Sequence, residues 1–198
     1  MRFILICCFL LIFNCEKKEE AYTGKQLADK ERPLAELSIY NLPSEWETQR
    51  NQTMQLSKLR GNIVVIVMIY TSCKAACPRL VADMRSIESK LSDSILKKTK
   101  LVLVSIDPET DTVDRLAEFA RENEMDADHW LFLRSTEANT REFANVLAVK
   151  YKQISPMDFS HSNIISVFDQ EGVLVHQQEG LGVDNQETIN KIIELSSN

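Results

Sequence analysis

A run of eight apolar residues at positions 63–70 is rich in β-branched side chains. An apolar run without polar alternation predicts a strand buried on both faces, as in the centre of a parallel sheet. Residues 101–106 repeat the pattern and predict a second core strand. Between them, apolar residues recur at helical spacing from Leu80 to Leu91, after a proline at position 78 that suits the first turn of a helix. The order strand, helix, strand predicts an α/β domain whose sheet begins with parallel strands.

Shorter patterns predict the remaining elements. Helices are expected at residues 110–122, 138–149 and 187–195, and strands at 37–42, 45–49, 130–133, 164–168 and 173–176. A turn is expected at residues 51–52, and a single helical turn at 56–61. The tight turn at residues 170–172 makes the last two strands antiparallel. This order describes a thioredoxin-like α/β fold, in which helices flank a central mixed β-sheet and a β-hairpin extends the N-terminal side.

The N-terminal segment has the features of an export signal. An apolar run at residues 3–13 follows Arg2, and eleven residues are too few to span a bilayer as a helix, which takes about 20. The run matches the apolar part of a secretory signal. Cys15 follows at once, which suggests a bacterial lipoprotein whose signal peptide, residues 1–14, is removed to leave Cys15 as a lipidated N-terminus. A plain cleaved signal is the alternative, but no A-x-A-like site lies nearby.

Residues 15–36 are dominated by charged side chains and bury too little to order themselves, so we expect a flexible tether before a domain at 37–198. The expected location is the periplasmic side of a bacterial membrane, at the inner rather than the outer membrane, with the lipid as the membrane contact. The formal net charge is −6, from 23 basic and 29 acidic residues, without a basic stripe. This charge argues against nucleic acid as a partner.

The signal and the lipid account for three of the five cysteines, which leaves Cys73 and Cys77. Both follow the first core strand, where open α/β sheets place their ligand sites. A disulfide between residues so close in sequence closes almost no loop and adds little stability, so a chemical role is favoured. The helix N-terminus, with Lys74 and Arg79 nearby, is expected to favour a thiolate. The functional interpretation is a redox or metal-binding pair, and the alternative is an incidental pair.

Four segments together resemble the SCO/SenC family of cytochrome c oxidase assembly proteins. They are the cysteine loop Y-T-S-C-K-A-A-C-P at 70–78, S-I-D-P-E-T-D-T at 105–112, D-F-S-H-S at 158–162, and L-S-K-L-R-G at 56–61. The resemblance covers about residues 37–198. The chain departs from many relatives by having Lys74 where they have proline and Ser160 where they have aspartate, with Asp158 two positions further back.

The resemblance implies one copper ion per chain, Cu(I) or Cu(II), held by Cys73, Cys77 and His161. The chemistry of these side chains agrees, since thiolates suit Cu(I) and imidazole helps to accommodate Cu(II). The implied partners are the copper-site subunit of cytochrome c oxidase and other copper chaperones or thiol reductants. The expected function is to deliver copper to the binuclear copper site of the oxidase, or to prepare that site.

A different function would use the same cysteines. A thiol-disulfide oxidoreductase would keep the oxidase cysteines reduced without copper transfer, and would not need His161. A peroxidase is disfavoured, because Ile66 and Tyr70 occupy the proline and threonine positions of the P-x-x-x-T-x-x-C pattern. The sequence favours a metallochaperone and leaves enzymatic activity open.

The remaining polar candidates receive more modest interpretations. Asp107 has two possible roles. It either contacts the ligand histidine on the side away from the metal and orients its ring, or it forms a turn before the following proline. Asp111 is expected to cap the following helix. His129 and His176 are expected to be structural, and Met157 is expected to anchor a loop rather than bind metal.

Overall fold

The structure is a computed structural model that describes residues 33–73, 76–155 and 158–197. The predicted signal peptide, residues 1–14, lies outside the described residues. So do Cys15, most of the predicted tether, Lys74 and Met157.

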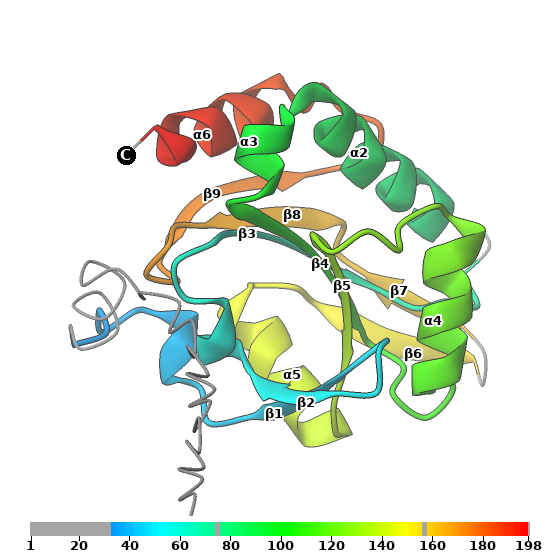
Figure 1. Ribbon diagram of the computed structural model, residues 1–198. Helices are drawn as coiled ribbons and strands as arrows, with labels where there is room; N and C mark the ends of the chain where they lie inside the picture. The colour runs from blue at the N-terminus through cyan, green and yellow to red at the C-terminus, as the bar shows by residue number, and fades with distance from the viewer. Residues whose placement is uncertain (1–32, 74–75, 156–157, 198) are drawn as a thin grey trace, which may run out of the picture. The chain divides into compact units, whose positions relative to one another are not determined.

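Among the described residues, seven strands form one mixed sheet (Figure 1). Its order is β2-β1-β5-β4-β3-β8-β9, in which β3, β4 and β5 run parallel and the other neighbours are antiparallel. The strands are β1 (Glu45–Thr48), β2 (Thr53–Gln55), β3 (Ile63–Ile69), β4 (Thr99–Ser105), β5 (Trp130–Arg134), β8 (Ile164–Phe168) and β9 (Leu174–Glu179). Every residue of β3 is buried, as its unbroken apolar sequence predicts.

Helices cover both faces of this sheet. They are α2 (Ala76–Lys90), α3 (Asp93–Leu96), α4 (Val113–Glu122), α5 (Glu137–Val146) and α6 (Gln186–Ser196). Figure 1 shows α2, α3 and α6 along one face and α5 on the opposite one, where the ring of Phe143 packs edge-on against Trp46 of β1 at 5.3 Å. Across the described ranges, no helix has both the length and the apolar character needed to cross a bilayer.

This arrangement confirms the predicted α/β class, the mixed sheet and the N-terminal hairpin, which β1 and β2 form around a left-handed Asn51. The predicted strand at 37–42 is wrong. Those residues form a short 3₁₀ helix, η1 (Ile39–Asn41), which Ser38 caps by accepting the backbone N–H of Tyr40. A second short 3₁₀ helix, η2 (Leu56–Leu59), occupies the predicted helical turn before β3.

The sequence analysis missed a separate two-stranded sheet formed by β6 (Tyr151–Ser155) and β7 (Asp158–His161). Four of the five residues of β6 are exposed, and Ile154 keeps 61 % of its surface accessible. A strand with no buried face has no reason to alternate apolar with polar residues, so the usual signal is absent. This hairpin is important because His161 is the last residue of β7.

Candidate metal centre

The two predicted cysteine ligands lie where β3 leads into α2. Cys73 is half-buried in the loop, and Cys77 lies in the first turn of α2 with 1 % of its surface exposed. Both are in the dithiol form. The backbone N–H of Cys77 donates to Cys73 Sγ at 3.3 Å, so the first turn of the helix holds one sulfur next to the residue that carries the other.

His161 approaches this pair from the β6–β7 hairpin. Its Nε2 lies 3.9 Å from Cys77 Sγ, although the two residues are 84 positions apart. Its Nδ1 lies 3.0 Å from the backbone carbonyl oxygen of Ser162, an acceptor that favours a proton on Nδ1. That tautomer leaves the lone pair of Nε2 directed toward the sulfur.

The spacing of Cys77 and His161 fits a shared metal ion. Metal–sulfur and metal–nitrogen bonds of about 2.3 and 2.0 Å, set about 120° apart, place the two donor atoms about 3.7 Å from each other. Within the described residues, no group of three or more His, Cys, Asp or Glu side chains is gathered closely enough to hold a metal. The structure therefore brings Cys77 and His161 together, and Cys73 adjoins Cys77, whose backbone N–H donates to the Cys73 sulfur.

Burial shifts the pKa values of Cys77 and His161, the two ligands that face each other. It raises the pKa of the Cys77 thiol, and the adjacent Cys73 raises it further. Burial also lowers the pKa of His161, with the Ser162 carbonyl acting in the opposite direction. The prediction of a stabilised thiolate is therefore wrong for Cys77 in the metal-free protein. Arg79, one of the two cations expected to favour the thiolate, is paired with another group, because its Nε lies 4.0 Å from Asp83.

An open hollow of about 450 Å³ gives access to His161. Lys150 and Lys152 of the hairpin segment and Glu179 at the end of β9 contribute to its lining. The histidine is thus reachable from outside, while Cys77 lies behind it in the core. A metal ion at this position would be held at the boundary between the core and the surface.

Asp107 forms a local turn in the loop after β4. It is buried, and its Oδ1 accepts the backbone N–H of Thr110 at 3.4 Å. This bond agrees with the turn-forming role that was one of the two expected for Asp107. The contact from this carboxylate to His161 stays a prediction, and the acceptor at the histidine Nδ1 is the Ser162 carbonyl.

Asp111 occupies a more central position than the sequence analysis assigned to it. The predicted N-cap role is wrong, because the neighbouring Thr112 caps α4 by accepting the backbone N–H of Arg115. Asp111 is fully buried and accepts hydrogen bonds from Thr71 Oγ1 at 2.5 Å and from Ser105 Oγ at 2.6 Å. It also lies 3.2 Å from the backbone nitrogen of Thr71, which donates to the same carboxylate.

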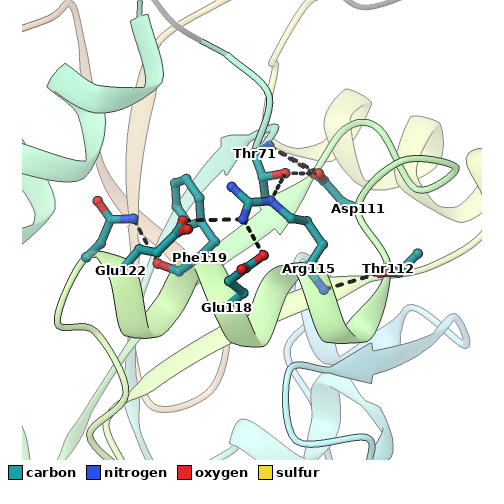
Figure 2. Close-up of polar contacts among 8 residues, drawn as sticks. Thr71, Asp111, Thr112, Arg115, Glu118, Phe119 and Glu122 are labelled. Atoms are coloured by element: carbon teal, nitrogen blue, oxygen red, sulfur yellow. Dashed lines mark hydrogen bonds and ion pairs between the residues drawn. The ribbon is translucent and has the colours of Figure 1, made fainter.

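Figure 2 shows how α4 extends this cluster. Arg115 Nε donates to Thr71 Oγ1 at 3.2 Å, and its Nη1 pairs with Glu118 at 2.7 Å. Burial raises the pKa of Asp111, while the bonds from Ser105 and Thr71 lower it. The cluster ties Thr71, two residues before Cys73, to Ser105 at the end of β4. The start of the cysteine loop is therefore held by hydrogen bonds within the fold.

Two further residues beside His161 carry contacts that the sequence analysis did not assign. The hydroxyl of Tyr70, the residue after β3, donates to Asp158 Oδ1 at the start of β7. Burial raises the pKa of Tyr70, and Asp158 and Cys73 raise it further, so the hydroxyl keeps its proton. The only sequence signal for this contact is a polar ring at the end of an otherwise aliphatic strand.

The other two histidines have structural partners away from this site. His129 Nε2 lies 2.5 Å from Glu88 Oε1, which also accepts the indole N–H of Trp130 at 2.8 Å. His176 Nε2 lies 3.0 Å from Thr188 Oγ1, between β9 and α6. These contacts agree with the structural roles expected for both.

Comparison with known proteins finds one family across almost all of the described chain. The sequence model of the family described as SCO1/SenC matches residues 39–197. A SCO1 protein homolog of Bacillus subtilis is 28 % identical over 103 residues, which are 52 % of this chain and 53 % of the relative. The match therefore spans about half the length of that relative.

Solved structures with the same fold come from plants and bacteria. ScoI of Arabidopsis thaliana, solved with copper bound, has a TM-score of 0.67 at 18 % identity and covers 78 % of this chain and 96 % of its own. BsSco, described as having a disulfide switch and as a member of the Sco family of cytochrome c oxidase assembly proteins, has a TM-score of 0.69 at 22 % identity, covering 83 % and 98 %. A SCO1/SenC family lipoprotein of Bacillus anthracis has a TM-score of 0.71 at 18 % identity, covering 80 % and 96 %.

Proposed function

Because this chain belongs to the SCO1/SenC family, we propose that it is a membrane-anchored protein that binds copper and delivers it to the binuclear copper site of cytochrome c oxidase, or prepares that site. The proposed ligands are Cys73, Cys77 and His161, and the proposed load is one Cu(I) or Cu(II) per chain. The proposed partners are the copper-site subunit of the oxidase and the copper chaperones or thiol reductants that serve it. The copper-bound state of a plant relative supports this choice of metal.

The observation that carries the proposal is the 3.9 Å approach of His161 Nε2 to Cys77 Sγ. A thiol-disulfide enzyme needs two sulfurs and no imidazole, whereas a copper site benefits from one. Thiolate and imidazole together suit copper in both of its oxidation states, because sulfur favours Cu(I) and nitrogen accommodates Cu(II). Three ligands also leave copper more open to a partner than the four ligands of structural zinc sites.

The surrounding residues support this chemistry in distinct ways. The carbonyl of Ser162 favours the tautomer in which Nε2 can accept a metal. Burial raises the pKa of the Cys77 thiol and so keeps its proton in place until a metal ion displaces it, and binding should therefore release a proton. Copper itself is the cargo, and the open hollow at His161 offers a route by which a partner reaches it.

The second candidate function is a thiol-disulfide oxidoreductase that keeps the oxidase cysteines reduced. It is favoured by the dithiol form of the cysteine pair and by the contact of the Cys77 amide with Cys73 Sγ. In that reaction, a target disulfide takes two electrons from the dithiol, and a bond forms between Cys73 and Cys77. The relative with a disulfide switch shares this fold.

Replacing His161 with alanine distinguishes the two functions. The variant loses a metal ligand but no redox atom, so we expect oxidation of its dithiol to remain nearly intact. We expect Cu(II) binding to weaken strongly and Cu(I) binding to weaken less, because the thiolates carry most of the Cu(I) affinity. In cells, oxidase activity should fall to the level of a strain with Cys73→Ser.

The control is His176→Ala, which removes an imidazole whose partner is Thr188 and should leave oxidase activity unchanged. Each strain is also grown with added copper, and partial rescue of His161→Ala agrees with delivery. If His161→Ala keeps full oxidase activity while Cys73→Ser loses it, copper delivery is wrong and the oxidoreductase function replaces it.

We further propose that Cys15 carries a lipid that anchors the domain on the periplasmic side of a bacterial membrane, at the inner membrane. The Cys residue directly after the short apolar run supports this, and a relative described as a lipoprotein has the same fold. Wild-type protein should sediment with membranes, and its N-terminal peptide should carry the mass of a lipid. An unmodified mature N-terminus in mass spectrometry would refute the proposal.

A further inference from the structure

The Tyr70 hydroxyl joins the end of β3 to the strand that carries His161. Tyr70 is 2 % exposed and follows β3 directly. Its hydroxyl donates to Asp158 Oδ1, and the backbone N–H of Phe159 donates back to the hydroxyl oxygen at 3.3 Å. The same Phe159 N–H lies 3.0 Å from Asp158 Oδ1. The Tyr70 hydroxyl, the Asp158 carboxylate and the Phe159 amide therefore form one hydrogen-bonded group that joins the end of β3 to β7.

The aromatic ring of Tyr70 reaches the same strand. It packs against Phe159 with ring centroids 5.2 Å apart, and it meets His161 edge-on at 6.0 Å with an interplanar angle of 80°. Residues 159 and 161 share one face of β7, because side chains alternate along a strand. Tyr70 thus lies against the face of β7 from which the imidazole reaches Cys77.

The β6–β7 hairpin depends on such contacts for its placement. Among the described strands, β6 and β7 pair with each other and belong to a sheet separate from the central one. A two-stranded hairpin is marginal by itself in water. The hairpin also touches α5, where the guanidinium of Arg141 lies 5.2 Å from the ring centroid of Tyr151. That contact is on β6, whereas the Tyr70 contact is on the strand of the histidine.

We propose that Tyr70 and Asp158 are positioning residues that hold His161 within reach of Cys77, and that copper binding through the imidazole depends on their hydrogen bond. The copper part of this inference rests on the proposed function. The structure assigns the carboxylate at position 158 to the Tyr70 hydroxyl.

The test compares two substitutions that remove the bond in different ways. Tyr70→Phe keeps the ring contacts with Phe159 and His161 and removes only the hydroxyl. Asp158→Ala removes both side-chain oxygens, and with them the acceptor of the bond, from an exposed position. Partners of this kind behind a metal ligand typically change metal affinity about 10- to 100-fold. We expect Cu(II) affinity to fall at least tenfold in each variant. In the electron paramagnetic resonance spectrum of Cu(II), the coupling to the imidazole nitrogen should be lost.

Cu(I) affinity should change less than Cu(II) affinity, because the two thiolates remain. The double variant should be no weaker than either single variant, since both substitutions break the same bond. The matched control is Tyr151→Phe, which makes the same chemical change in the same hairpin. The Tyr151 hydroxyl is buried without a hydrogen-bond partner among the described residues, so its loss should leave Cu(II) affinity at the wild-type value.

A second readout needs no copper. In the reduced, metal-free full-length chain in detergent, the backbone amides of Phe159 and His161 should exchange hydrogen about tenfold faster in Tyr70→Phe and Asp158→Ala than in the wild type, because local opening of the hairpin becomes easier. Tyr151→Phe should exchange at the wild-type rate. Amides of the buried strand β3 should be unaffected in all variants, which separates a local effect from general unfolding.

The outcomes separate this inference from the proposed function. Wild-type Cu(II) affinity together with wild-type exchange in both Tyr70→Phe and Asp158→Ala would overturn the inference. If the wild type binds no copper while exchange still accelerates, the positioning role stands and the copper function fails. If Tyr70→Phe does not fold, Asp158→Ala decides the result alone, because its side chain is on the surface.

Discussion

Serine in place of Cys77 is expected to abolish tight copper binding. Structural zinc sites with four ligands bind with apparent free energies of about 10–16 kcal/mol, or about 2.5–4 kcal/mol per ligand. By that measure, the loss of one thiolate weakens binding roughly 10²–10³-fold, since 1.4 kcal/mol corresponds to a factor of ten. Serine keeps the size of the side chain but offers a neutral oxygen, which suits Cu(I) poorly. Cys77 is buried and lies against His161, so a side chain on the surface cannot take its place as a copper ligand.

Copper titration of the reduced protein with a competing chelator measures this effect, and the intensity of the thiolate-to-Cu(II) absorption reports the bond directly. Wild type should bind one copper ion. Cys15→Ser makes the same chemical change at the cysteine that we assign to lipid, and should leave affinity intact. A Cys77→Ser protein that binds one copper ion as tightly as the wild type would show that this thiol is not a ligand.

Oxidation of the dithiol is expected to remove copper binding completely and reversibly. A bond between Cys73 and Cys77 consumes both thiolates, and deprotonated sulfur is the form that ligates metal. The amide of Cys77 already holds Cys73 Sγ at 3.3 Å, so the two sulfurs belong to adjacent parts of one turn. Copper loading and the disulfide are therefore alternative states of one site.

The measurement is copper affinity before oxidation, after oxidation and after reduction again. Affinity of the oxidised protein should drop below that of Cys77→Ser, which keeps one thiolate, and return on reduction. Cys77→Ser treated with the same oxidant serves as the control, because it cannot form the bond. Undiminished copper binding by a protein whose disulfide is verified by mass spectrometry would contradict the use of both sulfurs.

The core of the fold could be predicted because burial and sequence pattern coincide there. The apolar run at 63–70 became β3, and each residue of that strand is buried. The hairpin of β6 and β7 could not be predicted, because β6 is largely exposed and pairs outside the main sheet. The strand at 37–42 was wrong for a related reason, since the local backbone bonds of Ser38 and Tyr40 favour a 3₁₀ turn over pairing.

For the site, local chemistry identified residues better than it identified roles. Cys73 and Cys77 were recognised by residue type and position, His161 was implied by the family resemblance, and the structure brings Cys77 and His161 together. The role of Asp111 was missed because Asp111 and Thr112 are adjacent and both residue types cap helices. Only the packing of β3 against β4 shows that the aspartate is the buried one. The thiolate expectation failed for the same reason, since burial outweighs the helix end at Cys77.

The cluster around Asp111 has a consequence for how the protein would work as a carrier. The bonds of this carboxylate to Thr71 and Ser105 are made between protein groups that are not proposed metal ligands. In a zinc finger, the chain folds only when the ion binds, and loss of the ion unfolds it. Because the start of the cysteine loop is held here by the protein's own hydrogen bonds, we expect the chain to release a bound ion without unfolding.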